Sequence, residues 1–333
     1  MKISRSQDDF FQNKYLMHKF SPKDCPKDKT VFQWIKSQCD FKEAKEAAPP
    51  IRSYPDILSF KIKDWDPTKL AECTDDIIRN YGEFCWEHDR KSDYNPAYTG
   101  FSLVYNPSHQ EGLDPNGSTW GTSKNSGPEM YWDGTQNHEH LKDSYYDTYG
   151  FNVPSPASQH GYLGDFLKRC KASRIRSRVG IVHGARPAPD FFGWHKDEEI
   201  WENLRINIPI TTVESMKFQF EDKPPVHLDV GWAYSFDSNV PHRVFSAEAN
   251  ECRRIHLVLG FSPWFNHDPV EDVWYANEFY GKKHPFDMIV DGDILEGLEF
   301  DPDKVFKKSK LLFKHRNPHS DRFKNQTIST SVP

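Results

Sequence analysis

Residues 204 to 210 alternate between aliphatic and other side chains and read Leu204-Arg205-Ile206-Asn207-Ile208-Pro209-Ile210. This period of two predicts a β-strand that buries one face in a core. The opposite face carries Arg205, Asn207 and Pro209. A strand that buries one face normally shows its other face to water, but inside a barrel a face that bears arginine and asparagine indicates a polar pocket. We interpret this face as the lining of a polar pocket, with an ion pair inside the protein or an edge strand as alternatives.

A second strand of the same character reads Arg254-Ile255-His256-Leu257-Val258-Leu259. Because side chains alternate along a strand, Arg254 and His256 share the face that we assign to the pocket. Arg253 falls on the aliphatic face and is expected at the exposed entrance of the strand. A buried arginine needs an anionic partner, and a bound dicarboxylate is a suitable bidentate one.

The period of two begins near residue 174 and predicts strands at 175–183, 204–212, 216–221, 226–236, 242–247 and 252–261. Many short strands with few helical breaks favour a fold that is mainly β with flanking helices, around a double-stranded β-helix (jelly-roll or cupin-like) core. We expect a mixed helix and loop region at 1–155 that packs on the core. The double-stranded β-helix is expected at 156–265, and a helical extension with a basic tail at 266–333.

Outside the strands, a period of 3.6 predicts helices at 41–48, 67–90 and 158–172. Thr74 is a candidate N-cap in the second of these, with acidic residues after it. Residues 105–155 are rich in Gly, Asn, Ser, Asp and Tyr, which predicts long loops or a lid.

Composition limits the classes of function. The chain has 333 residues and a formal net charge of −6, a balance that makes duplex nucleic acid an unfavourable partner. No apolar stretch approaches the roughly 18 residues of a membrane span, and no secretory signal is recognisable. The six cysteines include no Cys-x-x-Cys pair, so we expect reduced thiols and a cytoplasmic location.

One His-x-Asp pair has the spacing of a metal site. His195 and Asp197 precede His242 by enough residues for several strands to intervene, so the three side chains can meet. Two histidines and one carboxylate form the facial triad of non-haem Fe(II) oxygenases, which leaves positions open for a co-substrate and oxygen. The alternative is that these histidines are structural.

Two further His-x-Asp pairs are weaker candidates. His227 and Asp229 are expected within a strand, where a histidine usually pairs with its neighbours. His319 and Asp321 lie in the basic tail with no histidine after them. His183 precedes the loop to the first metal-binding histidine and is a further candidate for the pocket wall, although a position in a turn is the simpler interpretation.

Together these motifs resemble the aspartyl/asparaginyl β-hydroxylase-like branch of the Fe(II)/2-oxoglutarate dioxygenases. The family pattern is a metal-binding His with a residue two positions on, then R-x-H-x-P, a second metal-binding His, and R-x-H-L. Within residues 174–264 this chain reads His195-Lys196-Asp197, Arg205-Ile206-Asn207-Ile208-Pro209, His242 and Arg254-Ile255-His256-Leu257. Asn207 departs from the pattern, because the family often has histidine there.

The resemblance implies an enzyme in which His195, Asp197 and His242 bind Fe(II). The co-substrates would be 2-oxoglutarate and O2, and a C–H bond of an amino acid, peptide side chain or other small metabolite would be hydroxylated with release of succinate and CO2. Some members have glycine at the position of Asp197, which leaves a site for halide, so the aspartate favours hydroxylation over halogenation. The motifs do not indicate the substrate or the oligomeric state.

The resemblance also implies roles in co-substrate binding. Arg254 would hold the distal carboxylate of 2-oxoglutarate, with Arg253 as the alternative because the spacing from the second metal-binding histidine is slightly long. Arg205 would lie near the metal-chelating end of the co-substrate, and Asn207 and His256 would line the same pocket.

Two other functions remain open. A non-catalytic jelly-roll binding or structural module would keep its histidines and arginines structural. A zinc hydrolase would use the same three metal ligands. Arg174, Arg176 and Arg178 alternate along the first strand and are interpreted as a solvated or ion-paired face, with a substrate clamp as the alternative.

Overall fold

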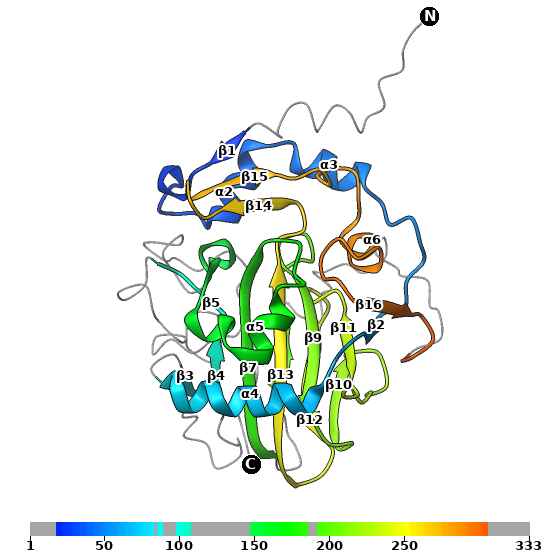
Figure 1. Ribbon diagram of the computed structural model, residues 1–333. Helices are drawn as coiled ribbons and strands as arrows, with labels where there is room; N and C mark the ends of the chain where they lie inside the picture. The colour runs from blue at the N-terminus through cyan, green and yellow to red at the C-terminus, as the bar shows by residue number, and fades with distance from the viewer. Residues whose placement is uncertain (1–17, 83–84, 89–97, 108–146, 186–191, 306–333) are drawn as a thin grey trace, which may run out of the picture.

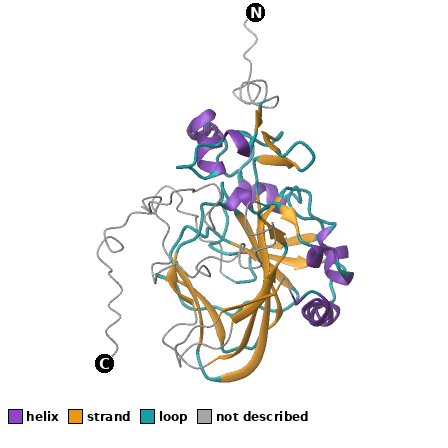
Figure 2. Ribbon diagram, turned by 90° about the vertical axis from the view of Figure 1, so that its left-hand side faces the viewer, coloured by secondary structure: helices purple, strands orange, loops and turns teal. Residues whose placement is uncertain are grey.

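The computed structural model describes residues 18–82, 85–88, 98–107, 147–185 and 192–305. Within them the chain is mainly β with a few short helices, which is compatible with a cupin-like fold (Figure 2). The largest element is an eight-stranded sheet. In spatial order its strands are β16 (Leu298–Asp301), β2 (Leu58–Ile62), β11 (Trp232–Ser235), β9 (Leu204–Thr211), β13 (Asn250–Phe261), β7 (Arg174–Ala185), β4 (Tyr98–Ser102) and β3 (Cys85–His88).

A smaller sheet faces the large one. Its strands are β10 (Met216–Phe220), β12 (His242–Ser246) and β8 (Phe192–His195), with β12 in the middle. The strands of both sheets pair antiparallel with their neighbours. Side chains from both sheets line one cavity, which therefore lies between them.

The outer face of the large sheet forms the main core. The aliphatic residues expected on one side of β9 are buried, and those of β13 and β7 join them in a single apolar cluster. Two helices contribute to the same cluster, α4 (Pro67–Asn80) and α5 (Gly161–Leu167), and they lie across these strands in Figure 1. With one face of the sheet closed by helices, the other face is directed at the small sheet and the cavity.

A third group of elements packs at the end of the large sheet (Figure 1). Strand β1 (Lys19–Phe20) pairs with β15 (Val273–Ala276), which also pairs with β14 (Phe265–Asp268). Helix α2 (Val31–Gln38) begins at a capping box, in which Thr30 and Gln33 each accept the other's backbone N–H. The remaining elements are α3 (Phe41–Ala47), α6 (Pro285–Val290), β5 (Val104–Tyr105), β6 (Val153–Pro154), η1 (Pro22–Asp24), η5 (Thr148–Gly150) and η6 (Pro156–Gln159).

The expected N-cap at Thr74 is wrong. Helix α4 begins at Pro67, and the carboxylate of Asp66 accepts the backbone N–H groups of Thr68 and Lys69, both at 3.1 Å. Thr74 lies inside the helix, fully buried, with its hydroxyl donating to the carbonyl of Leu70. An aspartate followed by proline is a stronger start signal, because it caps the helix and presets its first turn.

The segment after residue 265 also differs from the expectation of helical structure. In the part that the structure describes it contains the hairpin β14–β15, one short helix, α6, and strand β16. Strand β16 pairs with β2, so both lie in the large sheet. The large sheet thus takes strands from all three regions that the sequence suggested.

Other expectations are met in part. The strand expected at 226–236 is reduced to β11, because Gly231 adopts a φ of +87° directly before it. The helix expected at 158–172 is divided between η6 and α5. Most of the loop at 105–155 and of the basic tail lies outside the described residues. In the part of the chain that is described, no helix has the length and apolar character needed to cross a membrane.

Candidate metal centre

The two histidines of the predicted triad lie opposite each other on neighbouring strands. His195 ends β8 and His242 begins β12, and they are direct partners in the antiparallel register, with ring centroids 4.3 Å apart. Nδ1 of His242 donates to the carbonyl of Val240 at 2.8 Å. This bond fixes the tautomer, so Nε2 of His242 keeps a lone pair for a metal ion.

Asp197 completes the group from the loop that follows β8. Its Oδ2 lies 3.5 Å from Nε2 of His242 and 3.9 Å from Nε2 of His195. The backbone of Asp197 is held by the segment just before His242, because its N–H donates to the carbonyl of Ser238 at 2.8 Å and the side chain of Asn239 donates to its carbonyl at 3.2 Å. The structure therefore brings together the three residues that the sequence analysis grouped.

The carboxylate of Asp197 is ionised in this environment. Burial alone would raise its pKa, but the Arg205 guanidinium and the two imidazoles outweigh burial and hold the pKa well below its usual range. Arg205 donates from Nη1 to Oδ2 of Asp197 and from Nη2 to Glu198. The sequence placed Arg205 at the co-substrate. In the structure it lines the cavity, but its guanidinium is bound to two protein carboxylates.

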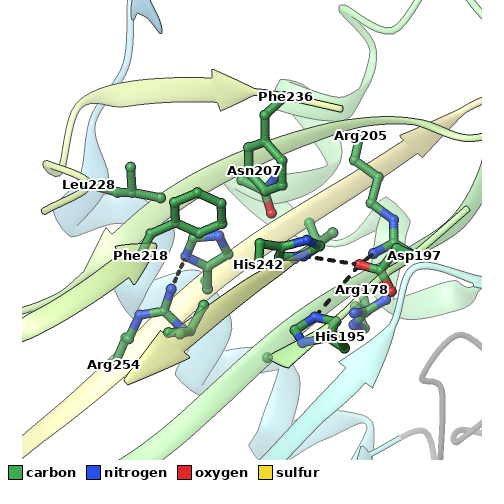
Figure 3. A pocket seen from close by; sticks show the side chains of 14 residues that line it. Arg178, His195, Asp197, Arg205, Asn207, Phe218, Leu228, Phe236, His242 and Arg254 are labelled. Atoms are coloured by element: carbon green, nitrogen blue, oxygen red, sulfur yellow. Dashed lines mark hydrogen bonds and ion pairs between the residues drawn. The ribbon is translucent and has the colours of Figure 1, made fainter. Parts of the chain in front are cut away.

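A cavity of about 110 Å³ adjoins the three residues (Figure 3). Its polar walls come from the large sheet and contain Arg178, Arg205, Asn207, Arg254 and His256. Its apolar walls contain Phe218, Leu228, Phe236, Val244 and Val258. A cavity with one charged end, one apolar side and a group of metal-type ligands can hold a small anionic molecule against a metal ion.

The structure separates the two adjacent arginines of β13 as strand parity predicts. Arg254 faces the cavity, whereas Arg253 lies on the outer face and pairs with Asp75 of α4 at 2.6 Å. Nη2 of Arg254 donates to Nδ1 of His256 at 2.8 Å. Burial, followed by the charges of Arg254 and Arg178, holds the pKa of His256 well below its usual value, so this imidazole is neutral.

Asn207 also faces the cavity, one strand away from His256. Its side chain is 9% exposed, and its Nδ2 has no hydrogen-bond partner. A buried amide donor without a partner is costly, by about 1–3 kcal/mol, so such groups usually mark a place where a ligand or water binds. Asn207 is therefore a donor available to a molecule in the cavity.

Two histidines from the sequence analysis lie elsewhere. His183 is exposed at the outer side of β7 opposite Arg253, where its Nε2 is 3.0 Å from the hydroxyl of Thr99. It is not among the residues that line the cavity. His227 bonds through Nδ1 to the carbonyl of Met216 at 3.0 Å and lies 3.7 Å from Asp229, but among the described residues it belongs to no group of three metal-type ligands.

Sequence reasoning missed two parts of the site. Arg178 lines the cavity, although the arginines of β7 were interpreted as a solvated or ion-paired face. Arg176 has an ion pair, as that interpretation allowed, but it is fully buried and its partner, at 3.5 Å, is Glu198 behind the metal ligands. The signal for Glu198 was its position directly after Asp197, but adjacency alone does not show that its side chain is buried.

The donor set fits a divalent metal ion. Among the described residues, His195, Asp197 and His242 form a group whose ligand atoms lie within 4.8 Å of one another. Two imidazole nitrogens and one carboxylate oxygen suit Fe(II) and Zn(II). The bond from His242 to Val240 and the ion pair of Asp197 with Arg205 are outer contacts of the kind that orient metal ligands.

Comparison with known proteins finds distant likeness only. No protein-family model matches the chain, and no curated protein matches it. Among solved structures, AviO1 from Streptomyces viridochromogenes Tue57 is 13% identical, and the match covers 67% of this chain and 96% of AviO1 with a TM-score of 0.30. A 2OG-Fe(II) oxygenase family oxidoreductase from Burkholderia pseudomallei is 13% identical over 61% of this chain and 93% of its own, with a TM-score of 0.28.

A third match is to a structure of the DMSP lyases RdDddP and RnDddQII, 20% identical over 27% of this chain, with a TM-score of 0.20. This chain spans 38% of the length of that lyase. All three TM-scores are low, so the function has to be inferred from the geometry of the site itself.

Proposed function

We propose that the chain is an Fe(II)- and 2-oxoglutarate-dependent oxygenase that hydroxylates a C–H bond of an amino acid, a peptide side chain or another small metabolite. The observation that carries the proposal is the grouping of His195, Asp197 and His242 at a cavity whose wall also holds Arg254. The first three offer a facial set of ligands, and the arginine offers a cation for a carboxylate.

The order of the strands supports a double-stranded β-helix. In the large sheet β7, β13, β9 and β11 are neighbours, and in the small sheet β8, β12 and β10 are neighbours. Consecutive strands of the chain thus alternate between the two sheets from β7 to β13, as expected where two antiparallel sheets are wound together. This arrangement places the end of β8 and the start of β12 at one end of the cavity.

His195, Asp197 and His242 would hold the iron. The chemistry that Fe(II) supplies when bound is the activation of O2, coupled to conversion of 2-oxoglutarate into succinate and CO2 and to hydroxylation of the substrate. Because Asp197 is a carboxylate where a halogenating relative would need an open position, we propose hydroxylation as the outcome. The order of the motifs along the chain favours the aspartyl/asparaginyl β-hydroxylase-like branch.

The chain's own residues would bind and orient the co-substrate. Arg254 would pair with the distal carboxylate of 2-oxoglutarate, since it faces the cavity. Nδ1 of His256 accepts a hydrogen bond from Arg254, so the proton of the neutral ring is on Nε2, which can donate to the same ligand. Asn207 would donate from Nδ2, and Phe218 and Phe236 would exclude water from that side of the cavity.

The test is formation of succinate by the purified protein with Fe(II), 2-oxoglutarate and O2, in a screen of amino acids, peptides and cell extract. We expect succinate in proportion to a product that is heavier by one oxygen atom. We also expect a visible charge-transfer band when Fe(II) and 2-oxoglutarate are added without oxygen. His195→Ala and Asp197→Ala should abolish both signals.

Two results would support the alternatives instead. Turnover that persists without oxygen and without 2-oxoglutarate would indicate a zinc hydrolase that uses the same ligands. Absence of metal binding in the intact protein would indicate a binding or structural module. Succinate formation that is undiminished in both variants would eliminate the triad as the metal centre.

A further inference from the structure

Four charged side chains behind the cavity form a buried network, which we call the carboxylate–guanidinium network: Asp197, Arg205, Glu198 and Arg176. Arg205 donates from Nη1 to Asp197 and from Nη2 to Glu198. The other oxygen of Glu198 lies 3.5 Å from Nη1 of Arg176. The network pairs two cations with two anions, so it is neutral before any metal ion binds.

Glu198 is the centre of this network. Its side chain is 6% exposed, and Thr148 donates to the oxygen that also faces Arg176, at 3.4 Å. Its backbone carbonyl accepts the hydroxyl of Ser238 at 2.8 Å. Two guanidiniums and one hydroxyl therefore face this buried carboxylate.

The backbone of β7 is distorted where it supplies Arg176. Between Val258 and Gly260 of β13 the register shifts, and β7 has one residue more than its partner strand. Arg176 takes a φ of +42°, a region that side chains other than glycine rarely adopt and that costs of order 1–3 kcal/mol. A bulge of this kind redirects a side chain, and here it directs Arg176 at Glu198.

We infer that Glu198 and Arg176 are positioning residues for the metal ligand Asp197, acting through Arg205. A guanidinium next to a single carboxylate tends to bind both carboxylate oxygens in a bidentate pair. In the structure Glu198 takes up Nη2 of Arg205, which turns the guanidinium so that the donor directed at Asp197 is Nη1. Lone pairs of Asp197 thereby stay available toward His195 and His242. Arg176 holds Glu198 in place for this.

This inference rests on the metal centre of the proposed function and not on the reaction. Its test is the affinity of the full-length protein for Co(II), measured by calorimetry and by the visible d–d absorption of the bound ion. We expect Glu198→Gln to weaken Co(II) binding about 10- to 100-fold and to change the absorption band, as loss of an outer contact does at metal sites. Glu199→Gln is the matched control, because that side chain is about half exposed and pairs with Lys45, away from the network.

Glu198→Gln leaves two buried guanidiniums with a single carboxylate and could prevent folding. The double variant Arg176→Met/Glu198→Gln removes one charge of each sign, and we expect it to show the same loss of affinity and the same spectral change. Wild-type affinity and an unchanged band in either folded variant would overturn the inference. If the wild-type protein binds Co(II) but never forms succinate, the proposed reaction fails while the positioning role is still tested.

Discussion

Arg254 donates a hydrogen bond from Nη2 to Nδ1 of His256 at 2.8 Å, across two positions of the same strand. An arginine has no acceptor, so this contact requires an unprotonated Nδ1 on the histidine. Burial and the neighbouring guanidinium hold the pKa of His256 well below its usual value, in agreement with a neutral ring. One strand thus presents a charged and a neutral donor to the same cavity, which suits a carboxylate.

Arg254→Met should raise the KM for 2-oxoglutarate about 10- to 100-fold, because a hydrogen-bonded pair with a charged group is worth about 1.5–3 kcal/mol. Steady-state kinetics at varied 2-oxoglutarate would measure the change. The matched control is Arg253→Met, which removes a partly exposed ion pair with Asp75 and should leave this KM unchanged. Equal effects of the two substitutions would show that the anchor has been misassigned.

His242→Ala should abolish binding of Co(II), while His227→Ala should leave it intact. Both histidines lie near an aspartate, at 3.5 Å and 3.7 Å, so proximity alone does not distinguish them. Each also bonds through Nδ1 to a backbone carbonyl, that of Val240 or that of Met216. The difference is that His242 has a second imidazole opposite it and belongs to the group of three metal-type ligands found among the described residues. Calorimetric titration with Co(II) would compare the two variants. Binding retained in His242→Ala would place the metal elsewhere, and binding lost in a folded His227→Ala would contradict the structural role of His227.

Asn207→Leu should separate stability from co-substrate affinity. Leucine has a similar branched shape and removes a buried amide donor that has no partner, so the free energy of unfolding should stay the same or rise by about 1 kcal/mol. Affinity for 2-oxoglutarate in the presence of Co(II) should fall, because a donor to the ligand is lost. Denaturant unfolding and calorimetry would measure the two quantities. A destabilised variant with normal affinity would contradict the role of Asn207 as a donor to the co-substrate.

Alternation along strands predicted the side on which residues of the site lie. Side chains alternate between the two faces of a strand, and Arg254 and His256 alternate with the aliphatic residues. Both were therefore expected on the face opposite the aliphatic one, which in the structure faces the cavity. The spacing between Asp197 and His242 allowed the metal ligands to meet, and they do. Such inferences succeed where a strand is regular, because the face then follows from position alone.

The position of a residue along a strand indicates the face on which its side chain lies, but not the group that the side chain contacts. Arg205 lies on the cavity face as its position predicts, yet its guanidinium is bound to Asp197 and Glu198, which come from a loop whose path no local pattern indicates. Arg176 lies at a bulge, and an extra residue in one strand reverses the parity of the residues after it. Periodicity in the sequence therefore could not predict the ion-pair network behind the site.

Some predictions of helix and strand boundaries were wrong for a different reason, which lies in the local sequence. Thr74 has acidic residues after it and resembles an N-cap, but Asp66 followed by Pro67 begins the helix two turns earlier. The hairpin β14–β15 was missed because its strands are only four residues each, too short for a period of two to stand out.

Glu202 makes stability depend on pH with an unusual sign. Burial, then the charge of Glu198, raises its pKa from 4.5 to about 8. Between these values the native protein holds a proton that the unfolded chain has released, so the free energy of unfolding falls as the pH rises, by at most about 1.4 kcal/mol per pH unit. The loss of stability caused by Glu202 is complete above about pH 8 and absent below the pKa that this residue has in the unfolded chain.

Glu202→Gln mimics the protonated side chain, so its Tm should exceed that of the wild-type protein by a margin that grows from about pH 5 to about pH 8 and then levels off. Glu199→Gln is the control of opposite sign. Burial would raise the pKa of Glu199, but Lys45 outweighs it and the pKa is lowered. Because this ion pair is about half exposed and screened by solvent, the variant should lose only a little stability at neutral pH. Thermal unfolding followed by circular dichroism across this range would test both. A margin for Glu202→Gln that is constant with pH would show that Glu202 is ionised in the native protein.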